Sequence, residues 1–354
     1  MRMRGRCRLG LLGLLGCLWA VIPGPPISAA DPVVLHGAGA TFPLPFYGAA
    51  FENYARHHRV VVHYRGVGSG GGIRLLQQRK VDFGGTDAFM TAEELRAAAA
   101  PIVHLPTVLG AVAITYQLPG NPRLRLTAEV ITDIFLGQVR RWSDPRLVAL
   151  NPGRHLPDLP IRVAHRADSS GTTFIFSEYL TKTSAAWKER VGAGKSLKWP
   201  VGIGGEGNPG VAGLVRQAAG SIGYVELIYA LANGLTVAEV QNRAGRYILP
   251  HPASVTHAAM APLPPDTNAS LTDTEAAAGY PISGFTWLGI YREQDYDGRP
   301  RERAEALVDL LWWLTHDGQA HAGPLHYAPL PAEAVRKVEV LLRGLTFRGS
   351  PILR

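Results

Sequence analysis

Residues 162–176 read RVAHRADSSGTTFIF, and this stretch combines a strand, a loop and the start of a helix. A β-rich run ends at His165, and Arg166 follows it. Small residues then stand where the free backbone N–H groups of a helix start point outward: Ser169, Ser170, Gly171 and Thr172. Those donors, the positive end of the helix dipole and one guanidinium suit a tetrahedral oxyanion. An ordinary N-cap beside a surface arginine explains the same residues, so other segments must decide.

A second segment of this kind lies near the start of the chain. Residues 33–36 are an expected strand, GAGATFP follows at 37–43, and an amphipathic helical pattern comes next. Thr41 and Phe42 stand at the junction of loop and helix, where backbone N–H groups are again available. The alternative is a threonine N-cap with the phenylalanine ring packed beneath it.

A third segment runs from a β-branched strand into GVGSGGG, residues 66–72, where Ser69 offers a hydroxyl. Its glycines satisfy the G-x-G-x-x-G dinucleotide fingerprint, and Asp82 or Asp87 would then hold the ribose. Residues 202–207 satisfy the same pattern, which shows how easily a chain with 40 glycines produces it. Both interpretations share one mechanism, because glycines let the backbone approach an anionic phosphate at a helix N-terminus. Asp87 also precedes an expected helix, where an acid is usually a cap.

Four arginines and a short apolar run open the chain, and small residues follow up to Ala30. This pattern predicts a signal peptide over residues 1–30, cleaved near Ala30, with lipid anchoring through Cys17 as the alternative. Both cysteines, Cys7 and Cys17, lie in this leader, so the mature chain has no disulfide and no thiolate metal site.

The mature chain keeps a mild positive charge. Of 36 Lys and Arg residues, four belong to the leader, which leaves 32 against 28 Asp and Glu. That excess suits a small anion and is far from a nucleic-acid-binding stripe. No G-x-S-x-G, H-E-x-x-H or Cys/His zinc spacing occurs. We therefore expect neither an enzyme, nor a metal, nor a cofactor, nor a nucleic-acid partner.

Two long apolar runs, 104–116 and 280–291, are long enough to cross between two lobes. They predict one discontinuous lobe from residues 31–112 and 278–354, with residues 113–277 inserted as the second lobe. Alternating strand and helix patterns predict an α/β fold for both lobes.

Other segments give local predictions. Residues 127–137 form an expected helix, with Thr127 as its cap and Gly137 as its stop. Residues 301–315 have the pattern of an amphipathic helix. Residues 250–275, rich in Pro, Asn, Ser and Thr, are typical of a surface loop.

Taken together, these segments resemble the substrate-binding proteins of bacterial phosphate ABC transporters, over essentially the whole mature chain. The motifs that carry the resemblance are GAGATFP (37–43), GVGSGGG (66–72), VDFGGTDAFM (81–90), PTVLGAV (106–112), FLGQVRRWSDP (135–145), HRADSSGTTFIF (165–176), WPVGIGGEGN (199–208) and SIGYVE (221–226). The resemblance implies a two-lobed periplasmic-binding-protein fold of type II-like topology. Two strands would cross the hinge, and the ligand would lie in the cleft between the lobes.

The resemblance also implies which residues bind phosphate. They are Thr41, Phe42 through its backbone N–H, Ser69, Asp87, Arg166, Ser170, Gly171 and Thr172, while Asp168 matches the acid that braces the arginine. This chain departs from the family at two positions. The family often has glycine in place of Ser169 and a second serine in place of Gly70.

Asp87 gives a physical reason for the choice of ligand. An ionised carboxylate offers only acceptor oxygens, and phosphate at neutral pH still carries an O–H proton. Sulfate carries none and would face the carboxylate unpaired and repelled. Sites built around one such hydrogen bond can reject the analogue that lacks it by ~10⁴–10⁵.

The resemblance implies an exported, monomeric periplasmic protein. It would bind inorganic phosphate and deliver it to the membrane permease subunits of an ABC transporter with a cytoplasmic ATPase subunit. Two alternatives remain: a secreted phosphate-ester hydrolase, and the same binding fold with another oxyanion as ligand.

Overall fold

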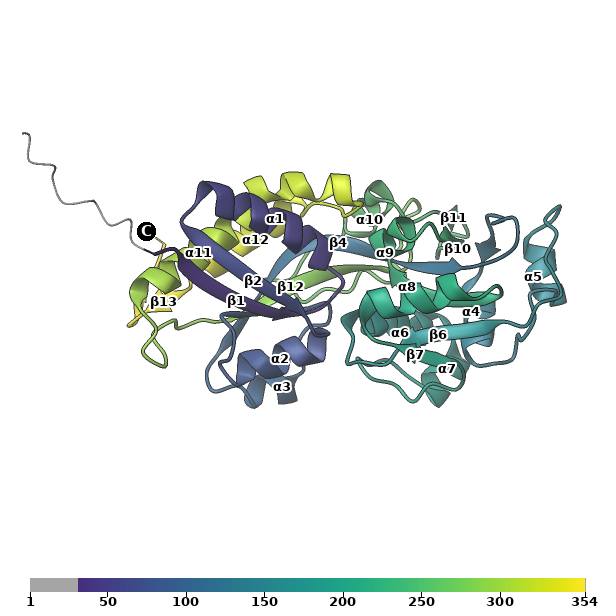
Figure 1. Ribbon diagram of the computed structural model, residues 1–354, viewed down its shortest axis with the longest axis horizontal. Helices are drawn as coiled ribbons and strands as arrows, with labels where there is room; N and C mark the ends of the chain where they lie inside the picture. Colours follow the sequence, from purple (N-terminus) through teal and green to yellow (C-terminus); the bar gives the residue numbers. More distant parts are fainter. Residues whose placement is uncertain (1–30, 354) are drawn as a thin grey trace, which may run out of the picture. The chain divides into compact units, whose positions relative to one another are not determined.

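The computed structural model describes residues 31–353, so the predicted signal peptide, its cleavage near Ala30 and Cys17 lie outside the described residues. One mixed sheet runs through both lobes (Figure 1). Its strands are β1 (Val33–Gly39), β2 (Val60–Gly66), β3 (Phe83–Thr86), β4 (Ile102–Tyr116), β6 (Arg162–Arg166), β7 (Ile203–Gly205), β8 (Ser221–Glu226), β9 (Thr236–Val237) and β12 (Ser283–Tyr291). Their order is β2-β1-β3-β12-β4-β8-β6-β7, with β9 beside β4.

The fifteen-residue strand β4 is shared by both halves of this sheet. Its first part pairs with β12 as far as Ala111, and its last part pairs with β8 from Val112 onward. Every residue of β4 after the first is buried, which explains the long apolar run in the sequence. The second predicted crossing, residues 280–291, forms β12, which begins at Ser283 and pairs with β3 and the first part of β4.

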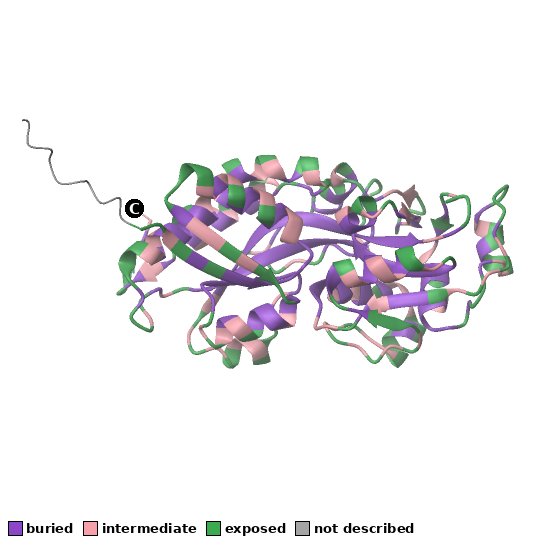
Figure 2. Cartoon of the chain, in the orientation of Figure 1, coloured by how far each residue is buried: buried purple, intermediate pink, exposed green. Residues whose placement is uncertain are grey.

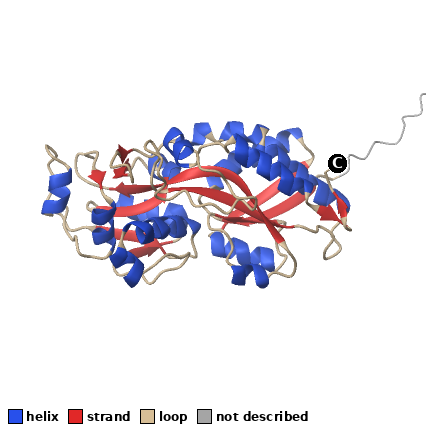
Figure 3. Ribbon diagram, turned by 180° about the vertical axis from the view of Figure 1, so that it is seen from behind, coloured by secondary structure: helices blue, strands red, loops and turns tan. Residues whose placement is uncertain are grey.

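Helices cover both faces of the sheet, as the view from behind in Figure 3 shows. They are α1 (Leu44–His57), α2 (Ser69–Gln77), α3 (Ala92–Arg96), α4 (Ala128–Phe135), α5 (Pro145–Leu150), α6 (Gly171–Thr183), α7 (Ala185–Arg190), α8 (Gly207–Gln217), α9 (Leu227–Ala232), α10 (Pro252–Ala258), α11 (Arg301–Thr315) and α12 (Ala332–Arg343), with 3-10 turns at Asp317–His321 and Gly323–Leu325. In the first lobe α1, α11 and α12 lie on one face and α2 and α3 on the other (Figure 1).

Two small sheets complete the fold. One is formed by β5 (Arg125–Leu126), β10 (Glu239–Gln241) and β11 (Tyr247–Ile248), and the other by β13 (Thr346–Phe347) and β14 (Ser350–Pro351). The strands of the main sheet are mostly buried, and exposed residues gather on the outer faces of the helices (Figure 2). No helix within residues 31–353 is long and apolar enough to cross a membrane.

Two local predictions need correction. The strand predicted to end at His36 continues to Gly39, because its last residues pair with Gly84 and Gly85 of β3. Gly39 adopts φ +149°, and a Cβ there would overlap the Gly85 backbone, so the strand needs glycine at this position. Residues 250–275 are not all loop, because α10 lies within them, with Pro252 at its first turn.

Candidate anion-binding site

Loop-to-helix junctions from both lobes meet at the carboxyl ends of parallel strands. Strands β1, β2 and β3 run parallel in the first lobe, and β6, β7 and β8 run parallel in the second. The residues after such strands gather at one edge of a sheet, where α/β folds bind ligands. Here Ser69 Oγ accepts hydrogen bonds from the backbone N–H of Asp87 at 3.2 Å and of Gly171 at 3.0 Å. The two lobes are therefore in direct contact through predicted site residues.

Arg166 is the cation of this cluster and is 3% exposed at the end of β6. Its Nε and one terminal nitrogen donate to the two oxygens of Asp168 at 2.7 and 2.5 Å, and its other terminal nitrogen donates to Thr172 Oγ1 at 3.2 Å. Burial opposes ionisation of Asp168, but the bonds from Arg166 outweigh it and lower the pKa of Asp168. Gly207 adds a backbone N–H to the same carboxylate at 3.1 Å. The guanidinium is thus held in one orientation.

Asp87 is the carboxylate of the cluster and is 2% exposed. It is not a helix cap, because Thr91 caps α3 in a capping box with Glu94. Its Oδ1 accepts a hydrogen bond from Thr286 Oγ1 of β12 at 2.7 Å. Burial raises the pKa of Asp87 to about 7, against the opposing effects of the Thr286 bond and the charge of Arg166.

Thr41 and Phe42 enter the cluster from the junction between β1 and α1. Thr41 Oγ1 accepts hydrogen bonds from both the backbone N–H and the Nδ2 of Asn208, at 3.1 and 3.0 Å. Phe42 is fully buried, and its carbonyl accepts the Tyr327 hydroxyl at 2.6 Å. Within residues 31–353 we find no acceptor for the backbone N–H of Phe42 or of the buried Thr172. A buried N–H group of this kind is costly unless a ligand accepts from it.

Two predicted residues already have protein partners. Ser170 caps α6, since its Oγ accepts from the Thr173 backbone N–H at 3.0 Å, and its own N–H donates to the Lys195 carbonyl. Gly171 donates its N–H to Ser69, as described above. A side chain could not replace its hydrogen, because a Cβ would come within 2.5 Å of Ser69 Oγ and 2.6 Å of Asp87. The structure therefore packs Gly171 directly against the carboxylate.

Two residues of the cluster were not singled out from the sequence. Asn208 ends the WPVGIGGEGN motif, and its Nδ2 reaches Thr172 Oγ1 at 3.1 Å in addition to Thr41. Thr286 lies in the middle of the largely apolar strand β12, and its hydroxyl was the only local sign of a polar contact at that position. Both were missed because their partners are distant in sequence.

The structure disfavours the dinucleotide interpretation of GVGSGGG. Asp82 is 2% exposed and both its oxygens are engaged. Arg303 donates to them at 2.9 and 2.8 Å, the His36 backbone N–H donates at 2.6 Å, and Arg299 forms a further ion pair. Asp82 is therefore a structural partner of α11 and its preceding loop, and it is not available to a ribose.

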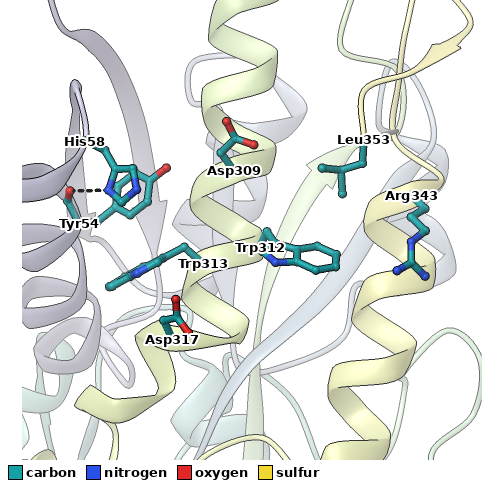
Figure 4. A pocket seen from close by; sticks show the side chains of 8 residues that line it. All are labelled: Tyr54, His58, Asp309, Trp312, Trp313, Asp317, Arg343 and Leu353. Carbon is teal, nitrogen blue, oxygen red and sulfur yellow. Dashed lines mark hydrogen bonds between the residues drawn. The ribbon is translucent and has the colours of Figure 1, made fainter.

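Other possible sites lie apart from this cluster. A hollow of about 450 Å³ contains none of the predicted residues (Figure 4). It is lined by Tyr54, His58, Asp309, Trp312, Trp313, Asp317, Arg343 and Leu353. In the described part of the chain, no group of three or more His, Cys, Asp or Glu side chains could hold a metal ion. The cluster around Arg166 and Asp87 is thus the best-supported candidate site.

Known proteins show the same arrangement of sequence and fold. The model described as the PBP superfamily domain matches residues 26–317. The "Phosphate-binding protein PstS" of Xylella fastidiosa is 39% identical over 322 residues, covering 89% of this chain and 86% of that one. The protein of the same name from Pasteurella multocida is 38% identical over 315 residues, covering 86% and 88%.

Solved structures agree on the fold. The high affinity periplasmic phosphate-binding protein PfluDING, solved with phosphate bound, superposes with a TM-score of 0.71 at 22% identity, covering 87% of this chain and 93% of that one. The two-lobed architecture is shared. On the family model and the identity over most of both chains, this chain belongs to the PBP superfamily and, within it, to the family of the phosphate-binding protein PstS.

Proposed function

We propose that this protein binds inorganic phosphate in the periplasm and delivers it to the permease subunits of an ABC transporter with a cytoplasmic ATPase. The names of its relatives and the phosphate-bound fold neighbour support this function. The observation that carries it is the composition of the site. Buried N–H and hydroxyl groups from both lobes lie in one cluster with the Arg166 guanidinium, which Asp168 holds, and with one further carboxylate, that of Asp87. A small anion that also carries a proton would accept from the donors of this cluster that lack a partner within residues 31–353, such as the Phe42 and Thr172 N–H groups, and would donate to Asp87.

The ligand set we propose is the one implied by the sequence. It consists of Thr41, Phe42, Ser69, Asp87, Arg166, Ser170, Gly171 and Thr172, with Asp168 holding Arg166. The first four belong to the first lobe, and the others belong to the second. Phosphate therefore makes contacts with both lobes that exist only when they meet, which favours the closed state. The closed protein, acting as a monomer, is the form that the permease recognises.

We also propose the lobe boundaries predicted above. Residues 31–112 and 278–354 form the first lobe, and 113–277 form the second. The change of partner along β4, between Ala111 and Val112, supports the first of these boundaries. Bending about this point would let the lobes separate without breaking either set of strand pairs.

Export follows from the leader. We propose cleavage near Ala30, which releases a protein that begins close to Asp31. The alternative is an anchor through Cys17. The mass of the purified native protein distinguishes the two, because lipid modification leaves Cys17 as the first residue and adds acyl chains.

The proposed function is binding without turnover. A secreted phosphate-ester hydrolase would also hold phosphate, so binding alone does not separate the two functions. We expect no release of chromophore from a chromogenic phosphate ester by the purified protein. Sustained turnover, well above a blank, would replace the proposed function with hydrolysis.

The central test is the affinity for phosphate of the Arg166→Ala variant, measured by calorimetry on phosphate-stripped protein. We expect a loss of at least about tenfold, because one charge-assisted donor is removed. Arg162→Ala is the matched control, since Arg162 is exposed on the same strand and should leave binding unchanged. Equal affinities for the Arg166 variant and the wild type would contradict the proposed site.

A further inference from the structure

Asn208 lies at the start of α8 and is fully buried, and every polar atom of its side chain is engaged. Its Oδ1 accepts the Glu226 backbone N–H at 2.9 Å. Because a backbone N–H can only donate, this bond fixes which end of the carboxamide is the oxygen. The amino end then faces two hydroxyls, Thr41 Oγ1 at 3.0 Å and Thr172 Oγ1 at 3.1 Å. One amide therefore spans the two lobes.

The lone pairs of these hydroxyls are filled by N–H donors. Thr41 Oγ1 accepts from the backbone N–H and from Nδ2 of Asn208, and Thr172 Oγ1 accepts from Nδ2 of Asn208 and from Arg166. A hydroxyl has two acceptor lone pairs and one donor hydrogen. With both lone pairs occupied, each hydroxyl can act toward a ligand only as a donor.

The hydroxyl of Ser69 is also restricted to donating its hydrogen, although Ser69 does not contact Asn208. Its Oγ accepts two backbone N–H groups, so its hydrogen is also directed outward. Within residues 31–353 we find no acceptor for the hydroxyl hydrogens of Thr41 or Thr172, whereas the hydroxyl of Ser69 bonds to the Asp87 carboxylate. The hydroxyls of Thr41 and Thr172 are thus both left with a hydrogen to donate, and both lie against the same side-chain amide of Asn208.

We propose that Asn208 is a positioning residue of the phosphate site, which fixes the hydroxyls of Thr41 and Thr172 as donors and joins them across the two lobes. This inference rests on the proposed function. It goes beyond the ligand set, because Asn208 need not touch phosphate. It explains how neutral hydroxyls, which rotate freely in water, become a donor array that matches an anion. Because the amide orders both hydroxyls when the lobes meet, the ligand does not have to fix them itself, and less free energy is lost on binding.

A purely structural role for Asn208 makes a different prediction. In that case its removal would lower stability, and any effect on binding would be independent of the hydroxyl of Thr41. A double-mutant cycle separates the two cases, because only a positioning role couples the residues. The cycle uses Asn208→Ala, Thr41→Val and the double variant, with phosphate affinity measured by calorimetry and folding checked by thermal unfolding.

We expect Asn208→Ala to weaken phosphate binding by about tenfold or more. Thr41→Val should cost about tenfold in the wild-type background and less than about threefold beside Asn208→Ala, because an unoriented hydroxyl contributes little. Asn151→Ala is the matched control. Asn151 is another buried asparagine with a full set of hydrogen bonds, and it lies outside the cluster. Its loss should lower the melting temperature and leave phosphate affinity unchanged.

The variant Asn208→Asp gives a second readout. A carboxylate of the same shape accepts where the amide donated, so the two hydroxyl hydrogens turn toward it and away from the ligand. We expect a larger loss than for alanine at neutral pH, with partial recovery as the pH falls and the introduced carboxyl gains a proton. The alanine variant should not show this recovery. Should Asn208→Ala fail to fold, this pH profile carries the test.

The outcomes distinguish this inference from the proposed function. Wild-type protein that binds no phosphate would overturn the proposed function and the role of Asn208 with it. Wild-type protein that binds phosphate, together with additive effects in the cycle, would overturn the positioning role alone. An Asn208→Asp loss that does not change with pH would do the same.

Discussion

Asp87 is a buried carboxyl in the site, and its pKa differs strongly from that of a carboxyl in water. Burial raises its pKa to about 7, so in the ligand-free protein the carboxyl is partly protonated at neutral pH. When ionised, it accepts a hydrogen bond from the O–H group of phosphate and repels a ligand that has no such group. When protonated, it becomes a donor, which sulfate can use. The discrimination expected from the sequence should therefore depend on pH.

We predict that sulfate competes with phosphate poorly at about pH 8.5 and at least about tenfold better at about pH 5.5, because Asp87 gains its proton between them. Displacement of radiolabelled phosphate by sulfate measures this. In Asp87→Asn the side chain keeps a donor at every pH, so sulfate should compete without pH dependence. A wild-type protein that rejects sulfate equally at both pH values would contradict the role of Asp87.

The two departures from the family pattern touch each other. The Gly70 N–H donates to the Ser169 carbonyl at 3.0 Å, and a Cβ on Gly70 would overlap the Ser169 side chain. The resemblance implies serine at position 70 and glycine at position 169, so one of these two positions would hold a small residue in either case. The contact joins α2 of the first lobe to the loop before α6 of the second. This contact arises only when the two elements pack together, so neither motif alone predicts it.

We predict that Gly70→Ser weakens phosphate binding by about tenfold or more, because the added side chain holds the two elements apart. Combining it with Ser169→Gly should restore most of the affinity. Ser169→Gly alone is the control, and it should have little effect because it only creates space. Calorimetry on the three variants checks this, and a double variant no better than Gly70→Ser would contradict the explanation.

Elements with complete local signals were predictable from the sequence. The helix predicted over residues 301–315 forms α11 with the same bounds, since most of its apolar side chains are buried in the core, while Trp312 and Trp313 are half-buried beside it. Thr127 caps α4 by accepting from the Val130 backbone N–H, as the spacing indicated. The apolar run at 104–116 forms most of β4, because a strand buried on both faces leaves a continuous apolar sequence.

Features that depend on distant partners were not predictable in this way. α10 begins after His251, whose ring nitrogen accepts the Ser254 backbone N–H, and histidine is not a usual cap. The ion pairs of Asp82 with Arg299 and Arg303 join residues more than two hundred positions apart. In the sequence Asn208 is simply an asparagine after several glycines, and only the folded chain places Thr41 and Thr172 beside its side chain. Local propensity does not encode such contacts between residues that are distant in sequence.

For the molecule as a whole, buried carboxyls link folding to pH. Burial raises the pKa of Asp87 to about 7 and the pKa of Glu226 well above its usual value. In the unfolded chain both groups ionise at about pH 4. Between about pH 4 and pH 7 the folded state therefore binds more protons, and the free energy of unfolding falls as the pH rises.

We predict that Asp87→Asn removes its share of this slope. In urea unfolding without phosphate, the variant should gain stability relative to the wild type as the pH rises from about 5 to about 8, by on the order of a few kcal/mol. Asp317→Asn is the matched control, because Asp317 is exposed. Parallel pH dependence in the wild type and the Asp87 variant would contradict the burial effect.

The position of β12 bears on how the protein is made. β12 lies between β3 and β4, pairing Trp287 with Thr86, so the central strand of the first lobe is supplied by the last quarter of the chain. A ribosome must synthesise nearly the whole polypeptide before that sheet can be completed. Pairings so remote in sequence also form slowly. The sheet of the first lobe therefore stays incomplete until residues 283–291 have left the ribosome.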